Sequence, residues 1–364
     1  MDTFNDGFTE LSYLNICKKI TEGIYENAIH SPSNKNPNYQ TKGLKFNFVN
    51  ESSVNAMARI TGEYDEIFIN TGTVTEIIAW IFSAFSNPAM YSFIGKTSSE
   101  NNMEVLAKYD HPTKAIHLTG TPKDKTRYSV AFSTALLGIR FICMHELGHL
   151  LNGHAYLIKD LYGVDCIDMV LKEKLYSIGL SNEYALDRRT MEMDADAFAI
   201  SSGISNLDGL INDNSDGFLN ALFHPLQIYE LWTFAVHSIF LMWERLYPTS
   251  YDSRSFYLPN LARQRLNISA AKSTIDSLMQ KGYIKYDALE RQSIFLYMES
   301  GVKQAEHFFN INKSTKFNYV HDFEQDKVYQ KYADEVLTHW NKNLRKRLEK
   351  YSRAVLFNPN GMDF

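Results

Sequence analysis

Cysteine is scarce in this chain, whose 364 residues include only Cys17, Cys143 and Cys166. Three cysteines are too few, and an odd number, for a disulfide framework, so the sequence favours a reducing compartment. An excess of positive charge is also lacking, because 37 Lys and Arg stand against 42 Asp and Glu, a net charge of −5. This balance provides no overall electrostatic footprint for nucleic acid. We therefore expect a protein without a nucleic acid partner.

Targeting signals are missing as well. The first residues, MDTFNDGFTE, are acidic and lack the basic-then-apolar order of a signal peptide, and no lipidation motif is present. One uncharged stretch, Ile77–Gly95, has the length of a membrane span. However, Asn87 and Pro88 interrupt it and several serines dilute it, which predicts a buried helix followed by a turn. We expect a cytoplasmic protein, with a membrane-anchored protein as the less favoured alternative.

Hydrophobic periodicity separates a β-containing first third from a helical remainder. Alternation of apolar and polar residues predicts short strands over residues 44–49, 54–60, 66–70, 104–109 and 114–119. Spacing of apolar residues by three and four predicts helices over residues 8–30, 75–86, 128–151, 190–201 and 225–245.

These elements divide the chain into three predicted parts. Residues 1–125 carry an N-terminal helix and the sheet, residues 126–310 carry the helical part, and residues 311–364 form a charged helical tail. Together they predict an α+β fold with a small antiparallel or mixed sheet over a helical bundle. The basic cluster of the tail, Arg345 to Arg347, is typical of a solvated helix face.

The most specific chemical signal is the pentapeptide HELGH, His145–His149. Two histidines four residues apart on a helix lie about 40° apart around its axis, so both imidazoles can reach one ion. Neutral imidazole is a good zinc ligand, and Glu146 projects beside the same position, where it can accept a proton from a bound water. The preceding residues are apolar and predict a buried helix. The alternative is two core histidines that are hydrogen-bonded to their neighbours.

A catalytic zinc site needs a third protein ligand and keeps one position open. His154 follows His149 by five residues and would point away from it on a continued helix, so we expect it at the helix end or behind the ligands. Glu192, in the segment MEMDADAFAI, offers a carboxylate, and Asp196 lies one turn further on the same predicted face. We predict His145, His149 and Glu192 as ligands of Zn²⁺, with Asp196 accepting the other ring N–H of a ligating histidine. The alternative is an acidic, solvated helix face.

These motifs resemble those of a known family. HELGHLLNGH, followed by ExxAD at Glu192–Asp196, resembles the gluzincin zinc metallopeptidases, closest to the HtpX-like and CAAX-prenyl-type endopeptidases and the Lit-like phage-exclusion proteases. The segment VNAMA, Val54–Ala58, resembles the edge strand of that family. The resemblance covers about residues 44–265 and implies a zincin-like fold in which the edge strand pairs with an extended peptide. It implies that Asn55 and Ala56 bind the substrate backbone.

The same families carry a downstream HP…R element. Its nearest matches here are Phe223-His224-Pro225 and Tyr257-Leu258-Pro259, the second followed by Arg263 and Arg265. A hydrogen-bond donor near the metal would stabilise the oxyanion of the transition state. Tyr257, His237 and His224 are the candidates for this role.

The sequence therefore predicts a zinc-dependent endopeptidase that hydrolyses a peptide or protein, with Glu146 as general base on a metal-activated water. One alternative is a narrow regulatory protease, ImmA-like or Lit-like, that acts on one cytoplasmic partner. Another is a non-catalytic zinc-binding interaction protein. Glu146 argues against the latter, because a purely structural site has no need of a base.

Overall fold

The computed structural model describes residues 11–31, 42–168, 182–213, 217–247, 255–312 and 323–356. Its strands are β1 (Gly43–Val49), β2 (Ala56–Ile60), β3 (Tyr64–Asn70), β4 (Leu106–Asp110), β5 (Ala115–Thr119) and β6 (Cys166–Asp168). Its α-helices are α1 (Leu11–Ile29), α2 (Thr71–Ser86), α3 (Lys125–Leu151), α4 (His154–Tyr162), α5 (Asn182–Asp213), α6 (Ile228–Leu246), α7 (Asn260–Gln280), α8 (Ala288–Asn312), α9 (Phe323–His339) and α10 (Arg345–Leu348).

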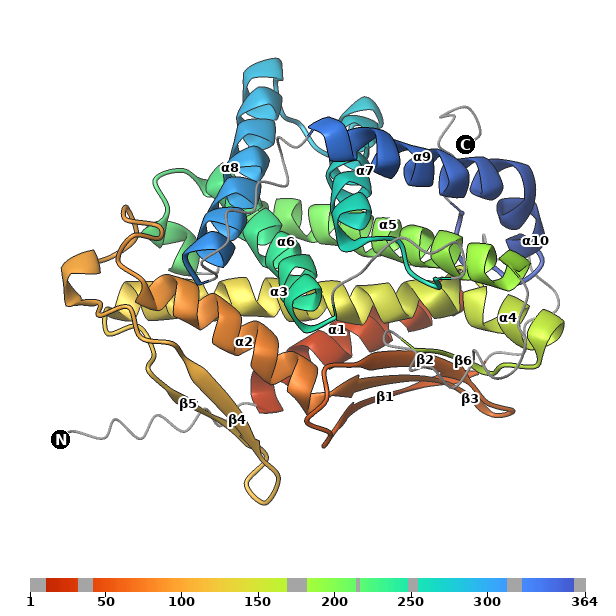
Figure 1. The fold of residues 1–364 in the computed structure, drawn as a ribbon, viewed down its shortest axis with the longest axis horizontal. Helices are drawn as coiled ribbons and strands as arrows, with labels where there is room; N and C mark the ends of the chain where they lie inside the picture. The colour runs from red at the N-terminus through yellow and green to blue at the C-terminus, as the bar shows by residue number, and fades with distance from the viewer. Residues whose placement is uncertain are drawn as a thin grey trace.

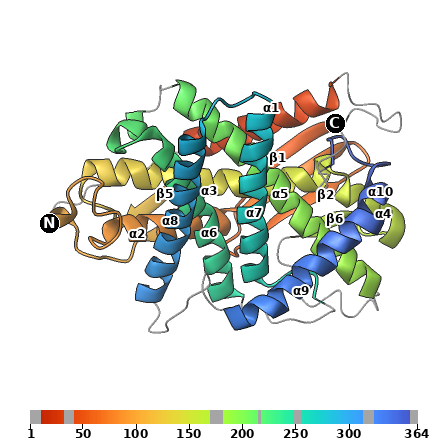
Figure 2. The same cartoon turned by 90° about the horizontal axis from the view of Figure 1, so that it is seen from above.

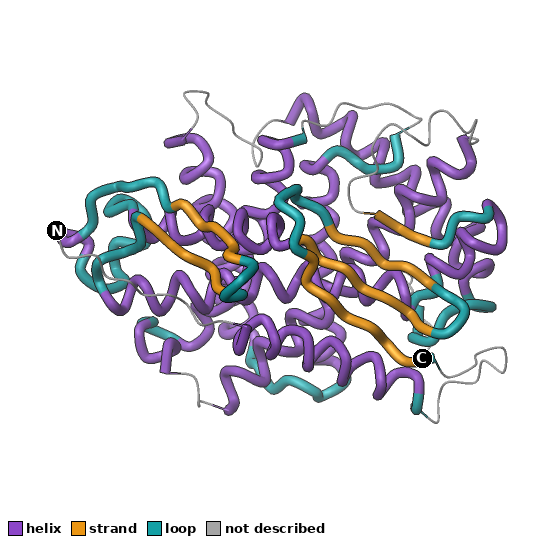
Figure 3. Tube along the Cα trace, turned by 90° about the horizontal axis from the view of Figure 1, so that it is seen from below, coloured by secondary structure: helices purple, strands orange, loops and turns teal. Residues whose placement is uncertain are grey.

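The predicted α+β class is confirmed: the described chain is mostly helical and contains a small mixed sheet. Four strands follow the order β1-β3-β2-β6, with β1 parallel to β3 and β2 antiparallel to both of its neighbours. Strands β4 and β5 form a separate antiparallel hairpin, and Figure 3 shows both sheets beneath the helices. Along β2 the side chains alternate between buried and half-buried, as expected for a strand with one face covered by the core.

The prediction that the VNAMA segment forms an edge strand is wrong where the segment enters the sheet, because Met57 and Ala58 pair with a strand on each side. Strand β2 lies between β3 and β6, and its residues Met57, Ala58 and Arg59 pair with β6 in an antiparallel register. The reason is the short length of β6. Three residues carry too little periodicity to be recognised in a sequence, yet they are enough to cover the open side of β2.

Helix α3 is the central element of the fold. Figure 1 shows the four-stranded sheet on one side of α3 and helices α5 to α9 on the other. The helix begins after Asp124, whose side chain accepts a hydrogen bond from the backbone N–H of Arg127. Among the described residues, α3 is the one helix long and apolar enough to cross a membrane, but 78% of its most apolar window is buried inside the structure. The residues of Ile77–Gly95 instead form the second half of α2 and a turn, as the sequence predicted.

A glycine ends α3 and sets the direction of the next helix. Gly153 has a φ of +83°, a left-handed conformation that other residues rarely adopt. A Cβ atom at this position would lie 2.6 Å from Tyr351, so the C-terminal segment packs directly on the turn. The next residue, His154, therefore begins α4 at the end of α3 that carries the HELGH motif.

The C-terminal tail packs against the helical part. Figure 2 shows α9 beside α5 and α10 beside α4. Arg347 does not lie on a wholly solvated face, because both of its terminal nitrogens donate to the buried carboxylate of Asp187, each at 2.9 Å. Further along, Arg353 pairs at 2.7 Å with the buried Asp65 of β3. Both contacts tie the tail to elements that surround the HELGH end of α3.

Candidate metal centre

Close approach of α3 and α5 brings the predicted ligands together. A Cβ atom at Gly148 would lie 3.3 Å from the Cα of Ala195 and 3.2 Å from the Cβ of Phe198. The small residues of HELGH and MEMDADAFAI therefore let the two helices pack closely at this crossing. The histidines are on α3, and Glu192 lies on α5 one turn before the contact, so it faces them.

The ligand atoms converge with the spacing of a zinc site. Nε2 of His145 lies 3.2 Å from Nε2 of His149 and 3.3 Å from Oε2 of Glu192, and Nε2 of His149 lies 3.6 Å from Oε1 of Glu192. A tetrahedral ion with bonds of about 2.0–2.1 Å separates its ligand atoms by about 3.3 Å. All three side chains are buried, so the cluster is a group that could hold a metal ion.

His145 is held from behind by an acid and an arginine. Its Nδ1 lies 2.9 Å from Oδ1 of Asp196, the residue predicted for this position. The guanidinium of Arg263, from α7, donates to both carboxylate oxygens of Asp196 at 2.8 Å. Burial would raise the pKa of Asp196, but the positive charge of Arg263 holds it below its usual value. A carboxylate this close to Nδ1 favours the ring orientation in which Nε2 faces the cluster of His149 and Glu192.

His149 is held by a second chain of contacts. Its Nδ1 lies 3.0 Å from Nδ1 of His154, and Nε2 of His154 lies 3.0 Å from Oδ2 of Asp194. If Nε2 of His149 binds a metal, its proton resides on Nδ1 and is donated to His154, which donates its own to Asp194. Asn152 also donates to Asp194, at 2.6 Å. His154 thus lies behind the ligands, at the helix end where the sequence predicted it.

This second chain of contacts gives a testable expectation. Substitution of His154 by glutamine should weaken zinc binding by about 10–100-fold, because His149 loses the partner that orients its ring. Zinc affinity would be measured by competition with a chromophoric chelator, and the exposed His307→Gln provides the control for loss of a histidine. An unchanged affinity in His154→Gln would show that His149 is oriented without His154.

The surrounding charges and burial shift the pKa values of the two histidines in opposite directions. Burial lowers the pKa of His145, but Asp196 and Glu192 outweigh it and raise the pKa to about 10. Burial and the charge on His145 hold the pKa of His149 well below its usual value. The pKa of Glu192 is lowered, because His145 and two arginines outweigh burial. These shifts favour the imidazolium form of His145, with a proton on each ring nitrogen, and the neutral form of His149.

Glu146 is a buried carboxylate without a hydrogen-bond partner in the described structure. Its side chain is 1% exposed, and neither carboxylate oxygen has a hydrogen-bond partner in the described structure. Burial raises its pKa to about 8, and the charges that act on it include His145, Glu192 and Arg188. Oε2 of Glu192 also lacks a hydrogen bond. Buried unpaired carboxylate oxygens are costly, so these atoms fit a site completed by a cation and a water.

Arg188 is a residue of the site that the sequence did not reveal. It lies one turn before Glu192 on α5, and its Nη2 is 3.3 Å from Oε1 of Glu192 and 3.3 Å from the carbonyl oxygen of Asp168. The hydroxyl of Tyr257, a predicted catalytic residue, donates to the same carbonyl. The spacing of Arg188 and Glu192 by four residues was the available signal, because such pairs share a helix face.

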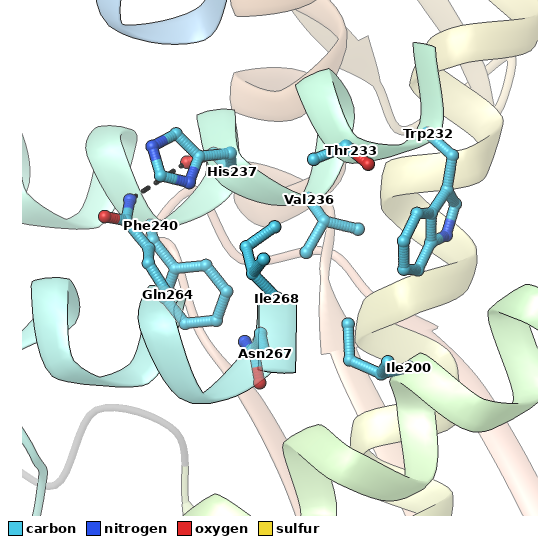
Figure 4. Close-up of a pocket in the computed structure, with 9 residues that line it drawn as sticks. All are labelled: Ile200, Trp232, Thr233, Val236, His237, Phe240, Gln264, Asn267 and Ile268. Atoms are coloured by element: carbon cyan, nitrogen blue, oxygen red, sulfur yellow. Dashed lines mark hydrogen bonds between the residues drawn. The ribbon is translucent and has the colours of Figure 1, made fainter. Parts of the chain in front are cut away.

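Two predicted candidates for oxyanion stabilisation lie elsewhere. His237 is 3.4 Å from Oε1 of Glu306 and lines a small pocket between α6 and α7 (Figure 4), and within the described chain it does not contact the three predicted ligands. Helix α6 buries His237 beside the polar side chain of Glu306. The spacing of residues in the sequence does not distinguish such a buried histidine from a catalytic one. His224 is exposed and accepts a hydrogen bond from the backbone N–H of Leu226, so its role in the His-Pro pair is to cap a short helix.

The two residues predicted to bind the substrate backbone are already hydrogen-bonded within the chain. The backbone N–H of Asn55 donates to Oγ1 of Thr73 at 2.8 Å, and its carbonyl accepts from Thr73 and Asn70. The N–H of Ala56 donates to Oδ1 of Asn55 at 2.9 Å. These contacts stabilise the start of β2 and leave neither N–H group for a peptide.

Comparisons with protein-family models, with curated proteins and with solved structures found no match for this chain.

Proposed function

We propose that the chain is a zinc-dependent endopeptidase of the zincin type, with His145, His149 and Glu192 as metal ligands. The observation that carries the proposal is the buried carboxylate of Glu146, whose two oxygens are unpaired and which interacts electrostatically with His145 and Glu192, two of the three convergent residues. A structural zinc site is usually closed by a fourth protein ligand, but an unpaired base beside three ligands is the arrangement of a hydrolase.

The residues of the site have separate roles in this proposal. A bound zinc ion would polarise the scissile carbonyl and lower the pKa of a coordinated water to about 7. Glu146 accepts the proton of the attacking water and passes it to the leaving amine. Asp196 and His154 keep the two imidazoles oriented. The hydroxyl of Tyr257, from the loop before α7, donates to the carbonyl of Asp168 in this structure and would turn to the developing oxyanion when a substrate is bound.

Burial of the site favours a narrow regulatory protease over a general one. The side chains of His145, His149, Glu146 and Glu192 are each at most 1% exposed. A peptide can reach them only after part of the protein has moved, a requirement that suits recognition of one folded partner. We therefore propose a single cytoplasmic protein as substrate, as for ImmA-like or Lit-like proteases. In a non-catalytic zinc-binding protein, by contrast, the buried and unpaired carboxylate of Glu146 would destabilise the fold and serve no function.

The metal content of the purified chain tests the proposal. We expect about one zinc per chain after purification without chelator, measured by mass spectrometry of the metal. Because the metal must displace the proton from His145, apparent affinity should fall at least about tenfold for each pH unit between pH 8.5 and 6.5, and more steeply below pH 8, where Glu146 also takes up a proton. A chain that holds no divalent ion would overturn the proposal. A flat affinity above pH 6.5 would show that His145 keeps an ordinary pKa.

A further inference from the structure

Strand β6 lies where a peptide substrate would be expected. A substrate of a sheet-flanked peptidase adds to an edge strand in extended conformation. On β2 that position is filled by β6, which pairs antiparallel with Ala58 opposite Ile167 and Met57 opposite Asp168. The carbonyl of Asp168 accepts hydrogen bonds from Nη2 of Arg188 and from the hydroxyl of Tyr257.

Arg188, which donates a hydrogen bond to the carbonyl of Asp168, has further N–H groups that are not hydrogen-bonded. Arg188 is 0% exposed, and its Nε and Nη1 have no hydrogen-bond partner in the described structure. It lies within reach of Glu192 and its charge acts on Glu146, so it borders the reacting centre. A buried guanidinium with unpaired N–H groups is costly unless an acceptor arrives. An oxyanion formed beside the metal ligands is such an acceptor.

We propose that Arg188 and Tyr257 are the carbonyl-binding pair of the substrate cleft, and that β6 fills this cleft as an internal stand-in for the substrate. The proposal rests on the peptidase function and deepens it. The substrate is then an extended segment with an apolar residue at the position of Ile167, whose side chain is 1% exposed. Because β6 has only three residues in register, its displacement by a longer strand breaks few hydrogen bonds.

The register of β6 allows a direct test with one substitution. Cys166 lies opposite Arg59 in the antiparallel pair, and the hydrogen bond from Ile60 N–H to Asp165 O makes Arg59 and Cys166 a non-hydrogen-bonded pair. Such pairs have Cα atoms about 4.5 Å apart, within the range of disulfides. Oxidation of Arg59→Cys with oxidised glutathione should therefore link β2 to β6. The other cysteines, Cys17 and Cys143, are buried.

The probe is the hydroxamate of acetyl-Ser-Ile-Asp, which follows the Cys-Ile-Asp sequence of β6 with serine in place of the cysteine and ends where the carbonyl of Asp168 lies. We expect oxidised Arg59→Cys to keep its zinc but to bind this probe at least tenfold more weakly than after reduction, measured by calorimetry. Arg59→Ser should bind the probe equally under both conditions. Equal binding by oxidised and reduced Arg59→Cys would show that substrate adds to the outer edge of β6 and would overturn the proposal. A wild-type chain without zinc would instead overturn the peptidase function itself.

Arg188 is tested with two probes of the same sequence. A phosphinic analogue presents an anionic tetrahedral centre, whereas the hydroxamate does not. We expect Arg188→Met to keep zinc and to weaken phosphinate binding by about 10²–10³-fold relative to hydroxamate binding, with partial recovery in Arg188→Lys. If the substitution also changes how easily β6 is displaced, both probes are affected equally, so this effect cancels in the ratio of phosphinate to hydroxamate affinity. Equal weakening of the two probes would show that Arg188 acts only through the fold.

Discussion

Substitution of Glu146 by glutamine is expected to leave zinc in place and to lower peptide hydrolysis by about 10²–10⁴-fold. Glutamine has the same shape but cannot accept the proton of the attacking water. Glu146 is not among the three convergent ligands, so its charge is not needed to hold the metal. Burial raises the pKa of its unpaired carboxylate to about 8, so Glu146 is a stronger base than an exposed glutamate.

Two measurements separate this role from a structural one. New N-termini in a cell lysate incubated with each variant report hydrolysis, and metal mass spectrometry reports zinc. The control is His149→Ala, which removes the Nε2 ligand and should lose both zinc and activity. If Glu146→Gln also loses its zinc, Glu146 supports the metal rather than the reaction. If it keeps full activity, another group is the base.

Asp196→Asn is expected to destabilise the fold by about 3–5 kcal/mol even in the absence of metal. Asp196 accepts two hydrogen bonds from Arg263, whose side chain is 3% exposed and stacks near the rings of Phe240 and Trp243. Removal of the carboxylate leaves a buried cation whose remaining acidic neighbour is Oε2 of Glu192, at 3.5 Å. Urea unfolding in the presence of EDTA would measure the change without a contribution from zinc.

An exposed ion pair provides the comparison. Glu299 lies 3.3 Å from Lys272, and half of its side chain is exposed to solvent. Glu299→Gln should therefore change the free energy of unfolding by about 1 kcal/mol or less. If Asp196→Asn costs no more than this control, then Arg263 finds another partner or solvent, and the contacts behind His145 do not stabilise the fold.

The cluster of His145, His149 and Glu192 was predictable from sequence because much of its geometry is local. His145 and His149 are fixed relative to each other by one turn of helix, and Glu192 lies in a short segment whose acids alternate with small apolar residues. The α+β class followed from the same periodicity. Only the approach of α3 and α5 was non-local, and the small residues Gly148 and Ala195 at that contact are visible in the motifs themselves.

The surroundings of the ligands were less predictable because they depend on contacts across the chain. The bidentate pair of Arg263 and Asp196 joins α7 to α5, and no spacing rule connects residues 67 positions apart. The edge-strand prediction failed on β6, which is too short to be recognised by periodicity. His237 was predicted as catalytic but lies beside Glu306, because a histidine on a buried helix has the same pattern whether it faces a metal or a glutamate.

The packing of the C-terminal tail has a consequence for how the protein matures during synthesis. The backbone N–H groups of Arg353 and Ala354 donate to the carbonyl of Leu151, two residues beyond His149, and Tyr351 packs on Gly153. A ribosome must translate past Ala354 before this end of α3 receives its last partners. The proposed metal centre therefore gains the contacts at this end of α3 only after residue 354 has been synthesised.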